Sequence, residues 1–239
     1  MIEIKALTKS FNGQKVLDGV DLTIAKGEIL VVLGQSGTGK SVLLKHIIGL
    51  LKPDSGSVKL NGTDISQLTE RELLAVRKKV GFLFQDGALY DFMTVFENVA
   101  FPLVEHTKLS VQQVTEKVIA TLESLDLHEV GNKLPSELSG GMRKRVALAR
   151  AIILDTDILL CDEPTSGLDP LRSRDISDVI YKISRKLGCS TVIASHDITN
   201  SFRIGDRLAL LNDGKVAAMG SAEQFRKSED HFVKEFMLR

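Results

Sequence analysis

Apolar residues in this chain gather into short runs that alternate with segments of helical spacing. Three runs lack polar alternation, as strands buried on both faces do, and they span 28–34, 157–163 and 190–197. After the first of them, apolar residues in 42–50 recur at the spacing of a helix. Buried strands followed by helices are typical of crossover connections, so the pattern predicts an α/β fold built on a mainly parallel sheet.

Other segments alternate apolar with polar residues and carry turn-forming pairs, which is typical of half-buried strands joined as hairpins. They cover 2–11, 20–27, 56–65 and 207–220, and the pairs Lys-Gly, Asn-Gly and Asp-Gly lie in the last three. We therefore expect an antiparallel flank of hairpins beside the parallel sheet.

A different pattern occupies about 110–131, where apolar residues recur at helical spacing between Gln, Glu and Lys: Val111, Val114, Val118, Leu122 and Leu125. It predicts a helical insertion without strands. Because no repeats, low-complexity tracts or linkers interrupt the chain, we expect a single domain over 1–239. Its core would comprise 1–85 and 158–239, and a helical subdomain would comprise about 86–157.

Composition narrows the possible functions. Lysine plus arginine equal aspartate plus glutamate at 31 each, so the chain lacks the basic excess typical of nucleic-acid binding, and we expect no nucleic-acid partner. No apolar run approaches the roughly 18 residues of a membrane span, and the first residues are too charged for a signal peptide. The chain is therefore expected in the cytosol unless something else carries it. Cys161 and Cys189 are interpreted as packed thiols.

The segment GQSGTGKS at 34–41 fits the pattern G-x-x-x-x-G-K-[ST] and lies between a predicted buried strand and a predicted helix. That context disfavours a chance glycine-rich turn. Glycines allow backbone N–H groups to converge on phosphates, toward which the next helix directs its positive end. Lys40 would reach the β- and γ-phosphate oxygens, and Ser41 would bind Mg²⁺. The expected nucleotide-binding residues are Gly34, Gln35, Ser36, Gly37, Thr38, Gly39, Lys40 and Ser41.

Polar side chains follow three apolar runs. Asp162 and Glu163 end one of them, at the sheet edge where open α/β folds bind ligands. Asp162 would hold Mg²⁺ through water, whereas Glu163 would orient the attacking water, because phosphoryl transfer depends on positioning and charge stabilisation. His196 would lie beside Glu163 if their strands are neighbours, and Gln85 has an amide able to bridge Mg²⁺ and the water. Taken alone, each of these last two residues would be interpreted as a surface residue.

The segment ELSGGM at 137–142 predicts a second anion-binding helix end, since Ser139 suits a helix N-cap and two glycines follow it. Together with the phosphate loop and ILLCDEP at 158–164, it makes nearly the whole chain resemble the ABC ATPases. That resemblance implies a P-loop NTPase core that binds and hydrolyses ATP. It also implies that Ser139, Gly140 and Gly141 of one subunit cap the γ-phosphate bound by its partner, in a head-to-tail homodimer that holds two ATP molecules.

The same resemblance implies further roles. ASHD matches the family's switch histidine, which places His196 against the γ-phosphate and the lytic water. Asp169 in SGLDP would help to couple the two sites. Phe11 matches an aromatic residue that stacks on adenine, although packing at a strand end competes as an explanation. Met142 stands where many members have glutamine, but because Glu163 and His196 are both present, we still expect ATPase turnover.

The segment after Gln85, DGALYDFMTVFENVAFPLVEHTKLS (86–110), resembles ATPases of the Mla type, which are associated with phospholipid transport between Gram-negative membranes, and Met142 agrees with that subfamily. This resemblance implies a permease-like membrane subunit that contacts the segment, an MCE-type lipid-binding subunit, and a peripheral homodimer on the cytoplasmic face of the inner membrane. Two alternatives stay open: an importer ATPase for another small substrate, and a cell-division type ATPase that signals through a membrane partner. A chromosome-structuring or translation ATPase is disfavoured, because the chain has neither a long heptad insertion nor two cassettes.

Overall fold

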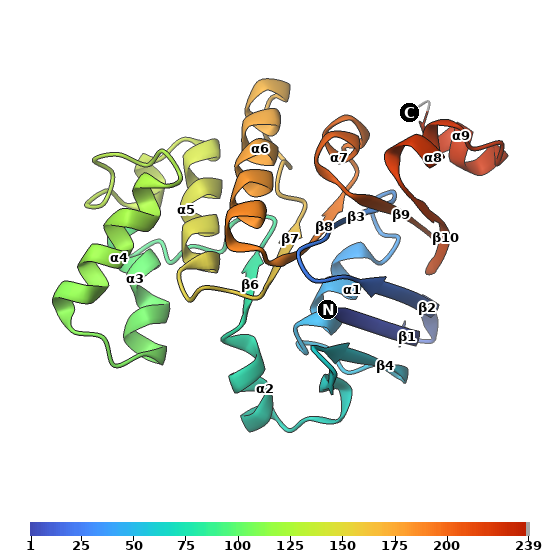
Figure 1. The fold of residues 1–239 in the computed structure, drawn as a ribbon, viewed down its shortest axis with the longest axis horizontal. Coiled ribbons are helices and arrows are strands. Elements are labelled where there is room, and N and C mark those ends of the chain that lie inside the picture. The colour runs from blue at the N-terminus through green and yellow to red at the C-terminus, as the bar shows by residue number, and fades with distance from the viewer. Residues whose placement is uncertain (238–239) are drawn as a thin grey trace.

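The main sheet has six strands and runs through the body of the molecule (Figure 1). The computed structural model describes residues 1–237. Every neighbouring pair of strands in this sheet is parallel except the pair at one edge, β10 and β9. The predicted α/β fold with a mainly parallel sheet is therefore confirmed. In spatial order the strands are β10 (Lys215–Gly220), β9 (Arg207–Asn212), β3 (Ile29–Leu33), β8 (Ser190–Ser195), β7 (Ile158–Asp162) and β6 (Val80–Leu83).

A second sheet beside the main sheet is antiparallel throughout, as the flank was predicted to be. Its strands in spatial order are β2 (Gln14–Ile24), β1 (Ile2–Phe11), β4 (Ser55–Leu60) and β5 (Thr63–Asp64).

The structure refines the prediction for two of the alternating segments. The hairpin over 207–220 exists, but its first strand, β9, pairs in parallel with β3 and belongs to the main sheet. Its four central residues are buried, because both faces of that sheet are covered. The Lys-Gly pair at 26–27 joins β2 to β3 in the other sheet and does not close a hairpin.

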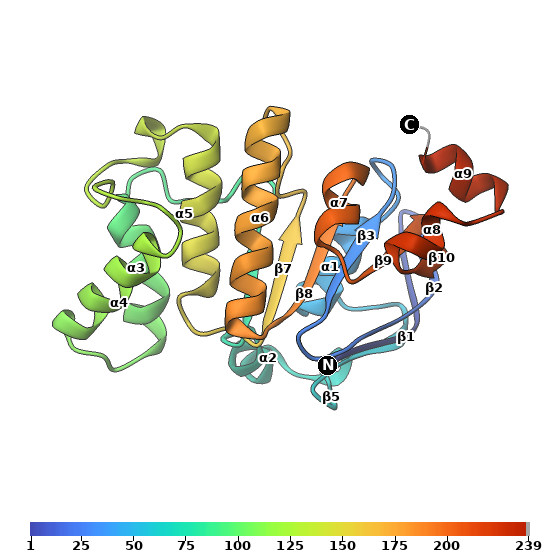
Figure 2. The same ribbon diagram turned by 45° about the horizontal axis from the view of Figure 1, so that its top comes forward.

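Helices cover both faces of the main sheet, as Figures 1 and 2 show. Within residues 1–237 no helix combines the length and the apolar character needed to cross a bilayer. The helices are α1 (Lys40–Ile47), α2 (Glu70–Arg77), α3 (Val95–His106), α4 (Val111–Glu123), α5 (Gly140–Ile152), α6 (Pro170–Leu187), α7 (Ile198–Ile204), α8 (Ala222–Arg226) and α9 (His231–Met237), with 3-10 turns at Ile65–Gln67 and Pro135–Glu137.

The strand β3, which leads into the phosphate loop, is buried along its whole length. Ile29, Val31 and Leu33 belong to a core shared with α5, α6 and α7, while Leu30 and Val32 belong to a second core shared with α1 and the antiparallel sheet. Full burial of such side chains contributes roughly 1.5–3 kcal/mol each. The start of the phosphate loop is therefore held from both faces of the sheet.

The predicted helical insertion is formed by α4, which packs with α3 and α5 at one end of the molecule (Figure 1). Val114, Val118 and Leu122 are buried, and Ser110 caps the helix in a capping box. Val111 departs from the expected apolar stripe, because it lies at the first turn of the helix and is 85% exposed. The boundary of the helical subdomain at 86–157 stays a prediction.

The two cysteines are buried and free. Burial raises the pKa of both thiols, so neither forms a thiolate readily. This environment agrees with the interpretation of Cys161 and Cys189 as packed thiols.

Candidate functional site

The carboxyl ends of four parallel strands meet at one edge of the main sheet. The phosphate loop (34–41) leaves β3, and Gln85, Glu163 and His196 follow β6, β7 and β8. Parallel pairing brings these ends to the same edge, where α/β folds bind their ligands. They border a hollow of about 290 Å³, called the nucleotide hollow below, which is lined by Val16, Ser36, Gly37, Gly39, Lys40, Ser41, Val42, Gln85, Glu163, Ser166 and His196.

Two glycines of the phosphate loop have no room for a side chain. A β-carbon on Gly34 would lie 2.6 Å from Thr38 Oγ1 and 2.7 Å from Leu211 O, and one on Gly39 would lie 2.8 Å from Val16 O. Gly39 also has a φ of 101°, in the left-handed region that favours glycine. The loop can therefore fold tightly over the strand end and leave its N–H groups and the start of α1 open to an anion.

Three residues of the predicted phosphate loop do not line the nucleotide hollow, and these are Gly34, Gln35 and Thr38. These residues stabilise the loop through hydrogen bonds on the side away from the hollow. Thr38 Oγ1 donates to Gln35 O at 2.9 Å, and Gly34 O accepts a hydrogen bond from the Lys40 amine.

Lys40 is buried beside the loop, with its charge compensated inside the chain. Its Nζ donates to Gly34 O at 2.7 Å and to Gln35 O at 3.0 Å, and it lies 3.2 Å from Glu163 Oε1. The side chains of Lys40 and Glu163 are 5% and 11% exposed, so little solvent screens this ion pair. A phosphate that binds Lys40 therefore competes with Glu163 for the amine.

Ser41 and Asp162 offer oxygen ligands of the kind that Mg²⁺ prefers. Ser41 Oγ donates to Asp162 Oδ1 at 2.8 Å. Burial raises the pKa of Asp162, the hydrogen bond from Ser41 opposes that rise, and the neighbouring Glu163 carboxylate adds to it. A cation beside Asp162 would favour its ionised form, so these donors fit the metal. Gln85 is exposed and holds a long hydrogen bond of 3.4 Å from Nε2 to Ser166 Oγ, which leaves its side chain loosely held.

Glu163 lies between Lys40 and His196. Because β7 and β8 are parallel neighbours, His196 does lie beside Glu163: its Nδ1, protonated in the appropriate tautomer, donates to Glu163 Oε2 at 2.7 Å. The backbone of Glu163 has a φ of 45°, which costs a non-glycine residue on the order of 1–3 kcal/mol. Strain of this kind is common at functional sites, and here it accompanies a carboxylate held between two cationic or proton-donating side chains.

Two residues that were not predicted from the sequence contact Gln85 at this site. Ser166 lines the nucleotide hollow and accepts the hydrogen bond from Gln85, but nothing in the sequence distinguishes it from an ordinary turn serine. Lys144 is only 7% exposed, and its amine donates to the backbone carbonyl of Gln85. Its position was an available signal, since it lies on the same face of α5 as Ala147 and Leu148, which are buried.

The signature turn (137–142) lies apart from the nucleotide hollow of its own chain. Ser139 is exposed and caps α5, where its Oγ accepts a 3.3 Å hydrogen bond from Met142 N–H. Gly140 and Gly141 follow as the first residues of that helix. None of Ser139, Gly140 and Gly141 lines the hollow. Within one chain, the signature turn and the phosphate loop therefore do not share this hollow.

Phe11, Asp169 and Met142 also lie outside the nucleotide hollow. Phe11 ends β1 and is 42% exposed, with Lys9 Nζ 5.5 Å from its ring centroid, so stacking on a base stays a prediction. Asp169 caps α6 by accepting a 3.0 Å hydrogen bond from Arg172 N–H. Met142 is partly buried and packs against the hydrophobic core, which shows how the signature turn accommodates an apolar residue there.

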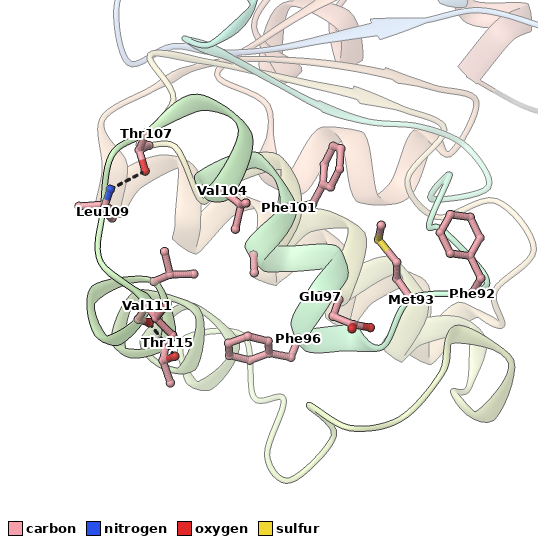
Figure 3. A pocket seen from close by; sticks show the side chains of 12 residues that line it. Phe92, Met93, Phe96, Glu97, Phe101, Val104, Thr107, Leu109, Val111 and Thr115 are labelled. Atoms are coloured by element: carbon pink, nitrogen blue, oxygen red, sulfur yellow. Dashed lines mark hydrogen bonds between the residues drawn. The ribbon is translucent and has the colours of Figure 1, made fainter.

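A second hollow is apolar and shares no lining residue with the nucleotide hollow. Figure 3 shows it between α3 and the start of α4, with Phe101 and Val104 on one side and Val111 and Thr115 on the other. It has a volume of about 630 Å³. Phe92, Val104 and Val111 at this surface are 78%, 63% and 85% exposed. Exposed apolar side chains gathered in this way are typical of a protein interface.

Comparison with known proteins relates the chain to one family. The model of the protein family described as ABC transporter matches residues 17–166. The chain is 42% identical to a probable ribonucleotide transport ATP-binding protein, mkl, of Mycobacterium leprae, over 99% of this chain and 68% of that relative. It is 41% identical to the intermembrane phospholipid transport system ATP-binding protein MlaF of Haemophilus influenzae, over 99% of this chain and 90% of the relative. The MlaF protein of Escherichia coli K12 is 37% identical over 99% of this chain and 88% of its own length.

Solved structures resemble the chain over nearly its whole length. One is a dimeric post-hydrolysis state of an ATP-binding cassette bound to ADP and phosphate, with a TM-score of 0.86 and 33% identity over 93% of this chain and 99% of that one. Another is cbiO1 from Clostridium perfringens, part of the ABC transporter complex cbiONQ, with a TM-score of 0.87 and 28% identity over 100% of this chain and 94% of that one. The likeness therefore extends to the helical part of the fold as well as to the sheets.

Proposed function

Because this chain belongs to the ABC transporter family, we propose that it is the ATP-hydrolysing subunit of a complex that transports phospholipids between bacterial membranes. The convergence of Lys40, Glu163 and His196 on one hollow supports ATP hydrolysis. The 41% identity to the Haemophilus MlaF protein, of which the chain covers 90%, supports phospholipid transport. The mycobacterial relatives are named for ribonucleotide transport, and the chain spans only 68% and 66% of two of them.

ATP binding begins at the phosphate loop, whose N–H groups and Lys40 would hold the β- and γ-phosphates. Ser41, Asp162 and the amide oxygen of Gln85 would hold Mg²⁺. The bound ion supplies positive charge that neutralises the β- and γ-phosphate oxygens during transfer. Phe11 would stack on the adenine ring.

The ion pair between Lys40 and Glu163 would link nucleotide binding to release of the Glu163 carboxylate. The γ-phosphate offers Lys40 a stronger anionic partner, so the amine would leave Glu163 Oε1, from which it lies 3.2 Å away. The released carboxylate oxygen can then accept a hydrogen bond from the attacking water and orient it. His196, 2.7 Å from the other carboxylate oxygen, would keep Glu163 in place and lie beside the γ-phosphate. Glu163 would thus become available to water only after nucleotide has bound.

The signature turn would complete the active site of a second copy. Ser139, Gly140 and Gly141 do not line the hollow of their own chain, yet Ser139 opens a helix whose positive end suits an anion. In a head-to-tail homodimer, each turn would cap the γ-phosphate held by its partner's phosphate loop, and Asp169 would help to couple the two sites. The solved structure of a dimeric cassette bound to ADP and phosphate supports the dimeric part of this proposal.

The membrane subunit would dock on the segment 86–110, which follows Gln85 directly and borders the apolar hollow. Its exposed side chains Phe92 and Val104 offer an apolar contact surface. We propose a permease partner there, an MCE-type lipid-binding subunit joined through the permease, and a peripheral position on the cytoplasmic face of the inner membrane. The balanced charge, with 31 basic and 31 acidic residues, supports a complex without nucleic acid.

A lipid-transfer assay on the complex purified with its membrane partners tests this function. Labelled phospholipid should move between donor and acceptor vesicles faster with ATP than without, in one of the two directions, and the complex carrying Glu163→Gln should show no such acceleration. Co-purification of a division-type membrane protein in place of an MCE subunit would support the signalling alternative. ATP-driven uptake of ribonucleotides without lipid transfer would instead support the function for which the mycobacterial relatives are named.

A further inference from the structure

The helix α5, which begins at the signature turn, holds the backbone of the segment that begins at Gln85. The Lys144 amine donates to the carbonyl oxygen of Gln85, and Arg150 donates at 2.8 Å to Gly87 O and to the carbonyl that follows it. Between these contacts Ala147 packs against Gly87. A β-carbon on Gly87 would lie only 3.3 Å from the Ala147 Cβ. The three helix positions recur every three residues and form one face. That face attaches the segment to α5.

Lysine at position 144 carries a cost in folding free energy, because its amine is buried. The residue is 7% exposed, and burial lowers its pKa. Within residues 1–237 the amine forms no ion pair, and the carboxylates of Asp86, Glu163 and Asp162 act on it from a greater distance. A buried ammonium group without a close countercharge costs several kcal/mol. An apolar side chain would pack there at lower cost, so the donor function toward Gln85 offers a reason for lysine.

The position of Gln85 depends on this contact together with a turn in which it lies, closed by a 2.9 Å hydrogen bond from Gly87 N–H to Phe84 O. Its strand, β6, ends at Leu83, two residues earlier. The side chain is exposed and makes a long hydrogen bond of 3.4 Å to Ser166. Lys144 and Arg150 therefore hold the backbone at and after Gln85 to α5, where the sheet no longer does.

From this geometry we propose that Lys144 is a positioning residue that couples the two ATP sites of the dimer. The proposal rests on the roles proposed above for Ser139 and Gln85. Lys144 lies about 7.5 Å along the helix axis from Ser139, roughly 1.4 turns, and an α-helix is rigid over this length. When Ser139 engages the partner's nucleotide, α5 shifts and Lys144 moves Gln85 with it. Gln85 already lines the nucleotide hollow of its own chain, but its side chain is fixed there only when the partner's site is also occupied.

Two substitutions distinguish the effect of the hydrogen bond from Lys144 from the effect of its packing. Lys144→Met keeps a long side chain but removes the donor and the charge, whereas Lys144→Arg keeps both. Lys182→Met is the control for the substitution itself. Lys182 is an exposed lysine on α6 and belongs neither to the nucleotide hollow nor to the signature turn. Ser139→Arg is the reference for loss of engagement between the subunits. Circular dichroism and thermal unfolding establish that each variant folds, and Lys144→Leu, which also lacks a donor, replaces Lys144→Met if the latter does not.

In steady-state ATPase assays we expect Lys144→Met to lower kcat by roughly 10- to 100-fold, within the range of typical coupling between sites. KM should change less than about threefold, because the phosphate loop that binds ATP is intact, and cooperativity between the two ATP sites should be lost. Lys144→Arg should recover most of kcat, and Lys182→Met should behave as wild type.

A second readout does not depend on turnover. In chains that carry Glu163→Gln, ATP should protect the amides of 86–90 from hydrogen exchange, together with those of the phosphate loop. With Lys144→Met added, protection of the phosphate loop should remain while protection of 86–90 is lost, and Lys144→Arg should restore it. A role confined to packing would leave the nucleotide-dependent part of this protection unchanged.

The proposal is overturned if Lys144→Met keeps wild-type kcat and cooperativity, or if Lys144→Arg fails as completely as Lys144→Met in a folded protein. Failure of the function on which it rests would look different. In that case wild type would lack ATPase activity, or Ser139→Arg would leave it unchanged.

Discussion

Replacing Glu163 by glutamine tests the proposed role of this residue in both chemistry and binding. The amide keeps the size of the side chain but removes the negative charge that lies 3.2 Å from Lys40 Nζ. Loss of a positioned base typically lowers turnover by about 10²–10⁴-fold, which corresponds to roughly 3–5 kcal/mol in the activation free energy. We expect Glu163→Gln to lose ATP hydrolysis to this extent while still binding ATP and retaining the dimer in its closed state.

The same substitution should make the chain more dependent on ATP for stability. Lys40 stays buried and keeps Gly34 O and Gln35 O as acceptors, but it loses its countercharge. Removal of one partner from a buried pair costs up to about 3–5 kcal/mol, an upper bound here because two carbonyl acceptors remain. The γ-phosphate supplies the missing negative charge, so ATP should raise the Tm of the variant more than that of wild type. At this chain length each 1 kcal/mol corresponds to about 2–4 °C.

Thermal unfolding with and without ATP, beside an ATPase assay, measures both effects. Glu28→Gln is a matched control, because the Glu28 side chain is 10% exposed and lies 3.0 Å from Arg207 Nη1, outside the nucleotide hollow. It should lose stability without loss of turnover or a larger effect of ATP. Normal turnover in Glu163→Gln, or an ATP-induced rise in Tm no larger than that of wild type, would refute the reasoning.

Two further substitutions test the effect of burial on Asp162 and the proposed adenine contact of Phe11. Asp162→Asn should raise the Tm of the nucleotide-free chain near neutral pH, because burial raises the pKa of this carboxyl and its ionised form therefore destabilises the fold. The advantage should shrink as the pH falls through the raised pKa and Asp162 takes up a proton, so equal Tm values at every pH in a series of melts would contradict the cause. Phe11→Ala should weaken ATP binding by roughly tenfold, since base stacking contributes about 1–3 kcal/mol, while the Tm stays nearly unchanged because the ring is 42% exposed. A lower Tm with unchanged affinity for a fluorescent ATP analogue would favour packing at the strand end.

Local patterns predicted the elements that carry the site. The buried run at 28–34, the glycine spacing of 34–41 and the acids after 157–161 each depend on neighbouring residues alone, and the structure brings them to one sheet edge. The adjacency of His196 and Glu163 also followed, once their strands were assumed to be neighbours.

Features that depend on contacts between residues far apart in the chain could not be predicted from the sequence. The pairing of β9 with β3 is decided by the cover on both faces of the main sheet, which alternation within β9 does not reveal. The apolar face of α5 indicates the burial of Lys144 only in part, because that burial comes from packing of α5 against the segment after Gln85. Ser166 became visible only when the strand ends had been assembled around it.

The most direct test of the composite site is subunit mixing. Ser139→Arg damages the signature turn, at an exposed position where loss of the cap costs about 1 kcal/mol, and Lys40→Ala damages the phosphate loop. Each variant alone should be inactive. A mixed dimer would contain one site with intact Lys40 and intact Ser139, and one site with both lesions.

ATPase activity measured across mixing ratios, at constant total protein, should therefore be absent at both ends and greatest at equal amounts. Random pairing would restore about a quarter of the wild-type sites, because half of the dimers are mixed and each has one intact site. The chain that supplies Lys40 to that site carries Ser139→Arg, so its Gln85 is uncoupled and the site should turn over with the roughly 10- to 100-fold lower kcat expected for Lys144→Met. Activity that stays absent at every ratio, with mixed dimers demonstrated by differently tagged subunits, would contradict a site built from Lys40 of one chain and Ser139 of the other.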